Sequence, residues 1–313
     1  MKKTLLSIVS FAFAAMMMSA QEASPLQQAT EMYNNGAAAL QTGDKQTALQ
    51  YFLNAEEIAG TLGDAGKDIV ANVRNVIPSI NLSIGKDLLK AGQFDEAIAK
   101  LNEVIALADK YEAFEIMGEA SELIPQIMMK KAVSLYNAKD FAGAVAAYQD
   151  VLNANPTNGV AALRMGAAYA AMGDVENAKS AFTLAAENGQ AATANKQLSN
   201  IFLKQAAAGL KTKNYEAALS SAAESLKYLE TPQAYRIAGQ AAQISGKNTE
   251  AIEYFTKYLE VAPTSKDAGQ IAYTLGYLYQ SAKNTAKAKE YYQKAVTDPQ
   301  YGADAKKILD SLK

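Results

Sequence analysis

The chain has 313 residues, half of them hydrophobic, which is enough for one large domain, two smaller ones or an elongated array. It contains neither cysteine nor histidine. This composition excludes disulfides, thiolate metal sites and every catalytic pair that relies on a histidine base. The net charge is only −2, and acids and bases are interspersed, which argues against nucleic acid as a partner.

The first twenty residues have the layout of a secretory signal peptide. Lys2 and Lys3 precede a mostly apolar run over residues 5–18, which is too short for a comfortable membrane span. We predict cleavage between Ala20 and Gln21 and export to the periplasm or beyond the cell; an uncleaved anchor is the alternative. Without a cysteine the exported chain is not expected to be a lipoprotein, and no second run reaches transmembrane length.

One pattern recurs seven times along the rest of the chain. A glycine or alanine is followed twelve positions later by an alanine, and four positions after that by an apolar residue. The seven sets are Gly36/Ala48/Phe52, Gly85/Ala97/Leu101, Ala132/Ala144/Tyr148, Gly166/Ala178/Phe182, Ala206/Ala218/Ala222, Gly239/Ala251/Phe255 and Gly276/Ala288/Tyr292. Small residues let two antiparallel helices approach closely, and the apolar residue one turn later fills the space between them. The spacing therefore predicts seven helical hairpins.

A short helix-breaking pair lies between the two helices of each predicted hairpin. The pairs are Gly43-Asp44, Gly92-Gln93, Lys139-Asp140, Gly173-Asp174, Lys213-Asn214, Gly246-Lys247 and Lys283-Asn284. Residues of these types end one helix and start another.

Proline positions give an independent indication of the hairpin boundaries. Pro78, Pro125 and Pro232 each lie nineteen residues before the repeated alanine, where we expect a hairpin to begin because proline lacks an N–H. The second and third hairpins carry extra residues before Pro78 and Pro125. We predict first helices extended by about three turns and kinked or broken at the proline, with an extra short helix as the alternative.

The pattern resembles the tetratricopeptide repeat family. In the fourth hairpin Leu163, Gly166 and Tyr169 are followed by Ala178 and Phe182, close to that family's consensus. The resemblance extends over roughly residues 26–300, although the fifth hairpin is degenerate and only some spacings equal the family's repeat length. It implies an all-α, right-handed α-solenoid of about seven helix-turn-helix hairpins.

The predicted solenoid spans residues 21–313. The hairpins cover residues 26–60, 64–109, 110–157, 158–190, 191–231, 232–265 and 266–300. The cap is residues 301–313, in which residues 303–312 are predicted to form a short amphipathic helix that covers the last hairpin with Ile308, Leu309 and Leu312 on one face.

Few residues could carry chemistry. Gly66-Lys67 faintly resembles a phosphate loop, but Thr61 replaces the required glycine and Asp68 the hydroxyl residue, so a helix-linking loop is favoured. The sequon at Asn81 is interpreted as incidental. Two acidic pairs, Glu56/Glu57 and Asp95/Glu96, fit an ordinary solvated helix face as well as they fit a catalytic role. We expect no enzymatic activity, cofactor or metal.

The resemblance implies that the first helices of the hairpins line a concave groove that holds a ligand. The matching positions give an apolar stretch and a polar, aromatic one. The apolar residues are Met129, Val133, Leu163, Ala167, Leu203 and Leu210; the others are Gln233, Arg236, Gln240, Tyr273, Tyr277 and Gln280. The residues with which some members of the family clamp a terminal carboxylate are absent from the matching positions, so that mode is not expected.

The first helix of the fourth hairpin, Val160 to Met172, has Arg164 as its only charge. A helix that is apolar all round should be buried on both sides, by a partner, a second copy or the inner curve of the solenoid. The sequence therefore favours a non-enzymatic scaffold or adaptor of the bacterial cell envelope that binds a protein or peptide segment. A glycan-binding module that uses Tyr273 and Tyr277 and a self-assembling structural protein are the alternatives.

Overall fold

The computed structural model describes residues 23–312, so the predicted signal peptide and its cleavage site at Ala20 and Gln21 lie outside the described residues. Within that range every regular element is a helix. The chain divides into two compact parts, with the boundary between Ala154 and Asn155, and each part is described by itself.

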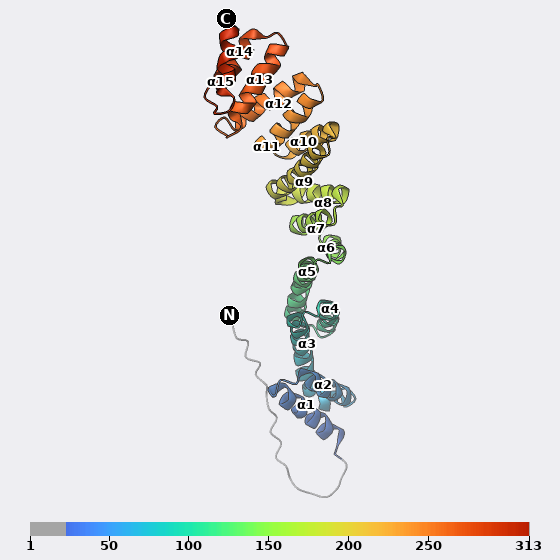
Figure 1. Cartoon of the computed structure of the whole chain (residues 1–313). Coiled ribbons are helices and arrows are strands. Elements are labelled where there is room, and N and C mark those ends of the chain that lie inside the picture. The colour runs from blue at the N-terminus through green and yellow to red at the C-terminus, as the bar shows by residue number, and fades with distance from the viewer. Residues whose placement is uncertain (1–22, 313) are drawn as a thin grey trace. The chain divides into compact units, whose positions relative to one another are not determined.

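The N-terminal part contains three antiparallel helix pairs, α1 with α2, α3 with α4 and α5 with α6 (Figure 1). A short 3-10 turn, η1 (Gly63–Gly66), connects the first pair to the second. The helices are α1 (Pro25–Gln41), α2 (Lys45–Gly60), α3 (Lys67–Lys90), α4 (Phe94–Lys110), α5 (Phe114–Asn137) and α6 (Phe141–Ala154).

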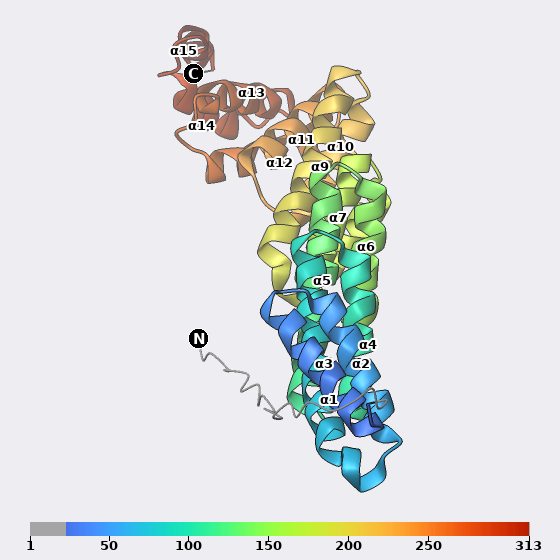
Figure 2. The ribbon, with the colours of Figure 1, turned by 90° about the horizontal axis from the view of Figure 1, so that it is seen from below.

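The C-terminal part contains four more pairs and a final single helix, which packs against the last pair (Figure 2). A π-helical turn, η2 (Ala186–Gln190), connects α8 to α9. The helices are α7 (Gly159–Met172), α8 (Val175–Ala185), α9 (Ala191–Lys211), α10 (Tyr215–Tyr228), α11 (Pro232–Ile244), α12 (Asn248–Val261), α13 (Ala268–Ser281), α14 (Thr285–Ala295) and α15 (Gly302–Ser311). The predicted solenoid of hairpins with a C-terminal capping helix is confirmed.

The turn inside each pair has the same backbone geometry. The first residue of every predicted breaker has a positive φ, between 60° and 84°; these residues are Gly43, Gly92, Lys139, Gly173, Lys213, Gly246 and Lys283. The next residue directly precedes the second helix, and in five pairs its side chain accepts a hydrogen bond from a backbone N–H in the first turn of that helix. These capping residues are Asp44, Asp140, Asp174, Asn214 and Asn284. A left-handed residue followed by an N-cap thus reverses the chain in each hairpin.

The glycine of the repeat explains how closely the two helices of a pair approach. A Cβ added to Gly239 would lie only 2.6 Å from the Phe255 ring, and one added to Gly276 would lie 2.7 Å from the Tyr292 ring. Both rings are buried. The ring sixteen residues after the glycine therefore packs directly on the glycine backbone, as the repeat spacing predicts.

The fifth pair is held together differently. Ala222 stands where other pairs carry a large side chain, and α9 approaches so closely that a Cβ on Gly209 would lie 2.8 Å from the backbone nitrogen of Ala218. The buried Ser225 hydroxyl lies 2.8 Å from the Ser199 hydroxyl and donates to the Ser199 carbonyl at 2.9 Å. Small residues and one buried polar pair thus replace the large apolar side chain that fills the other hairpins.

The predicted placement of two prolines at hairpin starts was wrong. Pro78 lies inside α3 and Pro125 inside α5, and each of these helices continues unbroken for 24 residues. Val73 and Ile77, which precede Pro78 in α3, are buried in the core that contains Tyr33 and Phe52. This burial offsets the roughly 3 kcal/mol that an interior proline costs a helix. The extended first helices are therefore single helices.

Candidate functional site

Two first helices of the C-terminal part, α11 and α13, present side chains at matching positions on their uncovered sides. The spacing is three, four and three residues, which keeps each set on one side of its helix. We name these two stripes the α11–α13 face; its residues are Gln233, Arg236, Gln240 and Gln243 on α11, and Gln270, Tyr273, Tyr277 and Gln280 on α13. The opposite sides of both helices are buried, mainly through alanine, isoleucine and leucine.

This face is almost uncharged. α13 has no charged residue, and α11 has only Arg236. The Arg236 guanidinium lies 3.5 Å from the carboxylate of Asp267, the residue before α13, so its charge has a partner. The second helices α12 and α14 carry acids and lysines throughout. The α11–α13 face therefore offers side-chain amides and phenols in place of ionic groups.

The aromatic residues of the face differ in what covers them. Tyr273 contacts the Tyr292 ring edge-to-face at 5.5 Å, and Tyr301, just before the capping helix α15, lies against it at 5.3 Å. Tyr277 is 56% exposed. Tyr277 is thus an open aromatic surface, whereas Tyr273 belongs largely to the packing of the capped end.

Below the face, Tyr292 of α14 connects the core to the surface. Its ring is fully buried against Gly276, while its hydroxyl donates a hydrogen bond of 2.8 Å to Oε1 of Gln280. Burial raises the pKa of Tyr292 to about 12, and the neighbouring Tyr273 and Tyr277 contribute to the rise. The hydroxyl therefore stays protonated near neutral pH and remains a donor.

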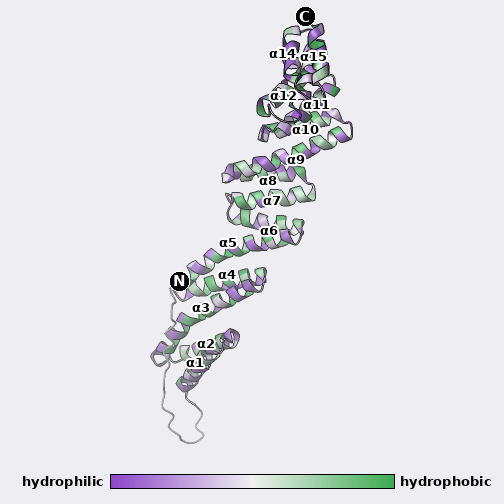
Figure 3. Ribbon diagram, turned by 60° about the vertical axis from the view of Figure 1, so that its left-hand side comes forward, coloured by the Kyte–Doolittle hydropathy of each residue, from purple (hydrophilic) through white to green (hydrophobic). Residues whose placement is uncertain are grey.

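The predicted apolar stretch is more enclosed than the polar one. Leu203 and Leu210 are partly buried against the core of the C-terminal part. Leu163 and Ala167 are half-buried on α7, which Figure 3 draws mostly in green. Met129 and Val133 are half-buried in the N-terminal part.

Burial of α7 is incomplete at both ends. Val160 is 43% exposed and Met172 is 50% exposed. These two side chains are therefore open in the single chain, and cover by a partner, a second copy or the inner curve of the solenoid stays a prediction.

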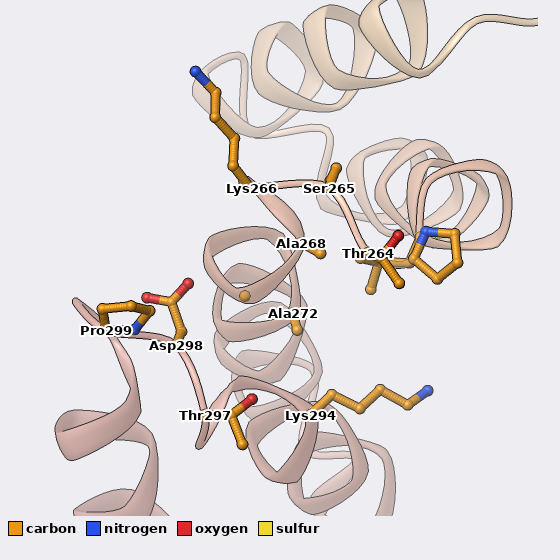
Figure 4. Close-up of a pocket in the computed structure, with 12 residues that line it drawn as sticks. Thr264, Ser265, Lys266, Ala268, Ala272, Lys294, Thr297, Asp298 and Pro299 are labelled. Carbon is orange, nitrogen blue, oxygen red and sulfur yellow. The ribbon is translucent and has the colours of Figure 1, made fainter.

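A cavity of about 590 Å³ lies beside the start of α13, between the α12–α13 connection and the segment before α15 (Figure 4). Oδ1 of Asp298 accepts hydrogen bonds of 2.9 Å from the backbone N–H groups of Gln300 and Tyr301. Oδ2 lies against Gly269, where an added Cβ would come within 2.1 Å of it. The Asp298 carboxylate thus already occupies the positive amino-terminal end of α13. We therefore interpret the cavity as part of the packing between the cap and the last pair, and not as a site for an anion.

The other motifs raised by the sequence have structural roles. Glu56 pairs with Arg74 at 2.7 Å and accepts a hydrogen bond of 2.7 Å from the Tyr111 hydroxyl, which links α2 to α3 and to the residue that follows α4. Gly66 ends the turn η1, and a Cβ there would lie 2.0 Å from the carbonyl oxygen of Ala59. Asn81 is buried and donates to the carbonyl of Ile77 at 3.0 Å, so the sequon is inside a helix and not accessible.

Residues 23–312 contain no cluster of acids that could hold a metal ion. None of the helices in that range combines the length and the apolar character needed to cross a membrane.

Three tetratricopeptide repeat family models match the chain, at residues 82–159, at 135–201, and at 232–265 and 269–297. Together they cover more than half of it. The chain belongs to the tetratricopeptide repeat family. This tetratricopeptide repeat fold supports a general role as a protein–protein interaction scaffold. No curated protein matches the chain.

Solved structures similar to this tetratricopeptide repeat chain are distant. A repeat protein of Bacteroides fragilis is 20% identical over 60% of this chain and 97% of its own, with a TM-score of 0.41. One from Parabacteroides merdae is 14% identical over 91% and 99%, with a TM-score of 0.30. YrrB, described as having an unusual peptide-binding site, is 23% identical over 58% and 91%, with a TM-score of 0.32.

Gln243 and Gln270 were not predicted from the sequence, although both follow from the three-four-three spacing of the predicted residues. The Tyr292 hydroxyl was not predicted either, because the repeat marks Tyr292 only as a core-filling ring. The coverage of Tyr273 by Tyr301 depends on how the cap packs, and no repeat spacing reports that.

Proposed function

We propose that this chain is a non-enzymatic scaffold of the bacterial cell envelope that binds a segment of another protein on its α11–α13 face. The observation that carries the proposal is the contrast between helices of the same hairpins. The first helices α11 and α13 expose glutamines and the Tyr277 ring, whereas α12 and α14 expose ordinary charged residues. Exposed aromatic residues among uncharged polar groups are typical of recognition surfaces.

A signal-peptide pattern in the sequence supports the envelope location. The basic start at Lys2 and Lys3, the short apolar run and the small residue Ala20 form a signal-peptide pattern. Cell fractionation followed by amino-terminal sequencing of the isolated protein tests this part. A mature chain in the periplasm or medium that begins at Gln21 is expected; a chain in the cytoplasm that keeps Lys2 would contradict it.

Site-specific photo-crosslinking in the native cell tests the binding face. A photoreactive residue at Tyr277 is expected to capture a defined protein. The same residue at Glu253, which is exposed on the second helix α12 of the neighbouring pair, serves as the matched control and should not. Equal crosslinking at both positions, or none at Tyr277, would contradict the assignment of the face.

A further inference from the structure

The packing of Tyr292 does not need its hydroxyl group. The same repeat position is phenylalanine in three other pairs, Phe52, Phe182 and Phe255. Each of those rings packs on the glycine of its own pair, as Tyr292 packs on Gly276. A phenylalanine therefore fills this space equally well, and the hydroxyl of Tyr292 is available for another role.

That hydroxyl reaches the binding face. It donates to Oε1 of Gln280 at 2.8 Å, so the otherwise exposed amide of Gln280 is held from inside the protein. Because Oε1 is the atom that accepts, the Nε2 amino group is directed away from Tyr292. Its N–H donors then face the surface one turn from the exposed ring of Tyr277.

The chemistry of the face indicates which group these donors would meet. Arg236 is the only charged residue on either helix and is paired with Asp267, so a free anion gains little here. A carbonyl oxygen accepts hydrogen bonds without needing to donate, which matches an outward amino group. The glutamines along both stripes can likewise donate to and accept from the peptide groups of an extended chain.

We propose that Tyr292 is a positioning residue of the binding face. It holds Gln280 so that the amide N–H groups donate to a main-chain carbonyl of an extended, uncharged protein segment that lies across Tyr277. This inference rests on the proposed function and specifies the chemistry of its partner. It also predicts binding that depends little on salt, because no ion pair forms at the contact.

The test uses the chain from Gln21 onward and twelve-residue peptides selected against it from a random displayed library. Peptides whose affinity falls on Tyr277→Ala are kept as probes of this face. Tyr292→Phe should weaken a probe about fivefold to tenfold, the equivalent of one net hydrogen bond. Tyr291→Phe is the matched control: it changes a buried tyrosine next in sequence, whose ring stacks on Tyr279, and should leave affinity unchanged.

A double-mutant cycle separates positioning from general damage. Gln280→Met should weaken the probe as much as Tyr292→Phe, and the double variant should be no weaker than Gln280→Met alone. The side-chain amide signals of Gln280 in NMR spectra should lose their order in Tyr292→Phe even without peptide. This readout would not move if Tyr292 were only a packing residue.

The outcomes are distinguishable. If no selected peptide responds to Tyr277→Ala, or if only glycans bind this face, the proposed function itself is wrong. If probes respond to Tyr277→Ala but bind Tyr292→Phe with unchanged affinity, or if the effects of Tyr292→Phe and Gln280→Met simply add, the role of Tyr292 is overturned while the binding face stands.

Discussion

Replacing Gly239 by alanine tests the packing rule on which every pair depends. A Cβ at this position would lie 2.6 Å from two carbons of the Phe255 ring, whereas ordinary contacts begin at 3.4 Å. The ring is only 2% exposed, so it has little room to move away. Forcing such an overlap costs about 1–3 kcal/mol. Alanine also favours a helix over glycine by about 1 kcal/mol, so the net loss of stability is about 0–2 kcal/mol.

Gly118 provides the control that isolates the overlap. It lies in the interior of α5, is exposed, and a Cβ there would meet nothing within 4 Å. Gly118→Ala should therefore stabilise its helix by about 1 kcal/mol. The difference between the two variants, about 1–3 kcal/mol, measures the overlap alone. Gly36→Ala should fall between them, since its Cβ would lie 3.1 Å from the Phe52 ring.

Native-state hydrogen exchange is the suitable assay, because repeat arrays open locally and a single midpoint would average over distant pairs. Exchange of α11 and α12 amides should accelerate in Gly239→Ala, and exchange of α5 amides should slow in Gly118→Ala. If both substitutions stabilise their helices equally, the close approach between Gly239 and Phe255 does not determine the packing of the pair.

Three further outcomes follow from the turns, the fifth pair and the tyrosines. Lys213→Gly and Lys283→Gly, at positions with φ of 60°, should each slow native-state hydrogen exchange in the two flanking helices by relieving about 0.5–1 kcal/mol of left-handed strain; faster exchange would refute this. Ser225→Ala should cost about 1–2 kcal/mol in the same assay, because the buried Ser199 hydroxyl loses its partner; no loss would contradict the pair's role. Burial, with the hydrogen bond to Glu56, raises the pKa of Tyr111 to about 12 from 10.0. Its contribution to stability is present below pH 10 and is lost as the pH rises toward 12; in ultraviolet titration Tyr111→Phe should remove a tyrosinate that forms near pH 12, and loss of one that forms near 10 would contradict the burial.

The twelve-residue gap predicted the hairpins because it reports a local constraint. Within one pair, the small residue and the ring sixteen positions later must meet, and Gly239 and Phe255 do so without help from distant residues. The positive φ of the breaker residues follows from the same local geometry. Sequence spacing therefore describes the inside of each pair well.

Features that depend on contacts between pairs could not be predicted in this way. Pro78 stays within α3 because Val73 and Ile77, which precede it, are buried against the preceding pair. The repeat pattern does not report the free energy that this burial contributes. Leu203 was predicted to line the groove, but its side chain is partly buried against the core. Tyr273 was predicted to line the groove, and the ring of Tyr301 lies against it and partly covers it.

The most direct test of the binding face is hydrogen exchange of the chain from Gln21 onward, with and without a saturating peptide selected from a random library. We predict slower exchange in α11 and α13, centred on Tyr277, and unchanged exchange in α12 and α14. Protection confined to the second helices, or to the cavity beside Asp298, would contradict it.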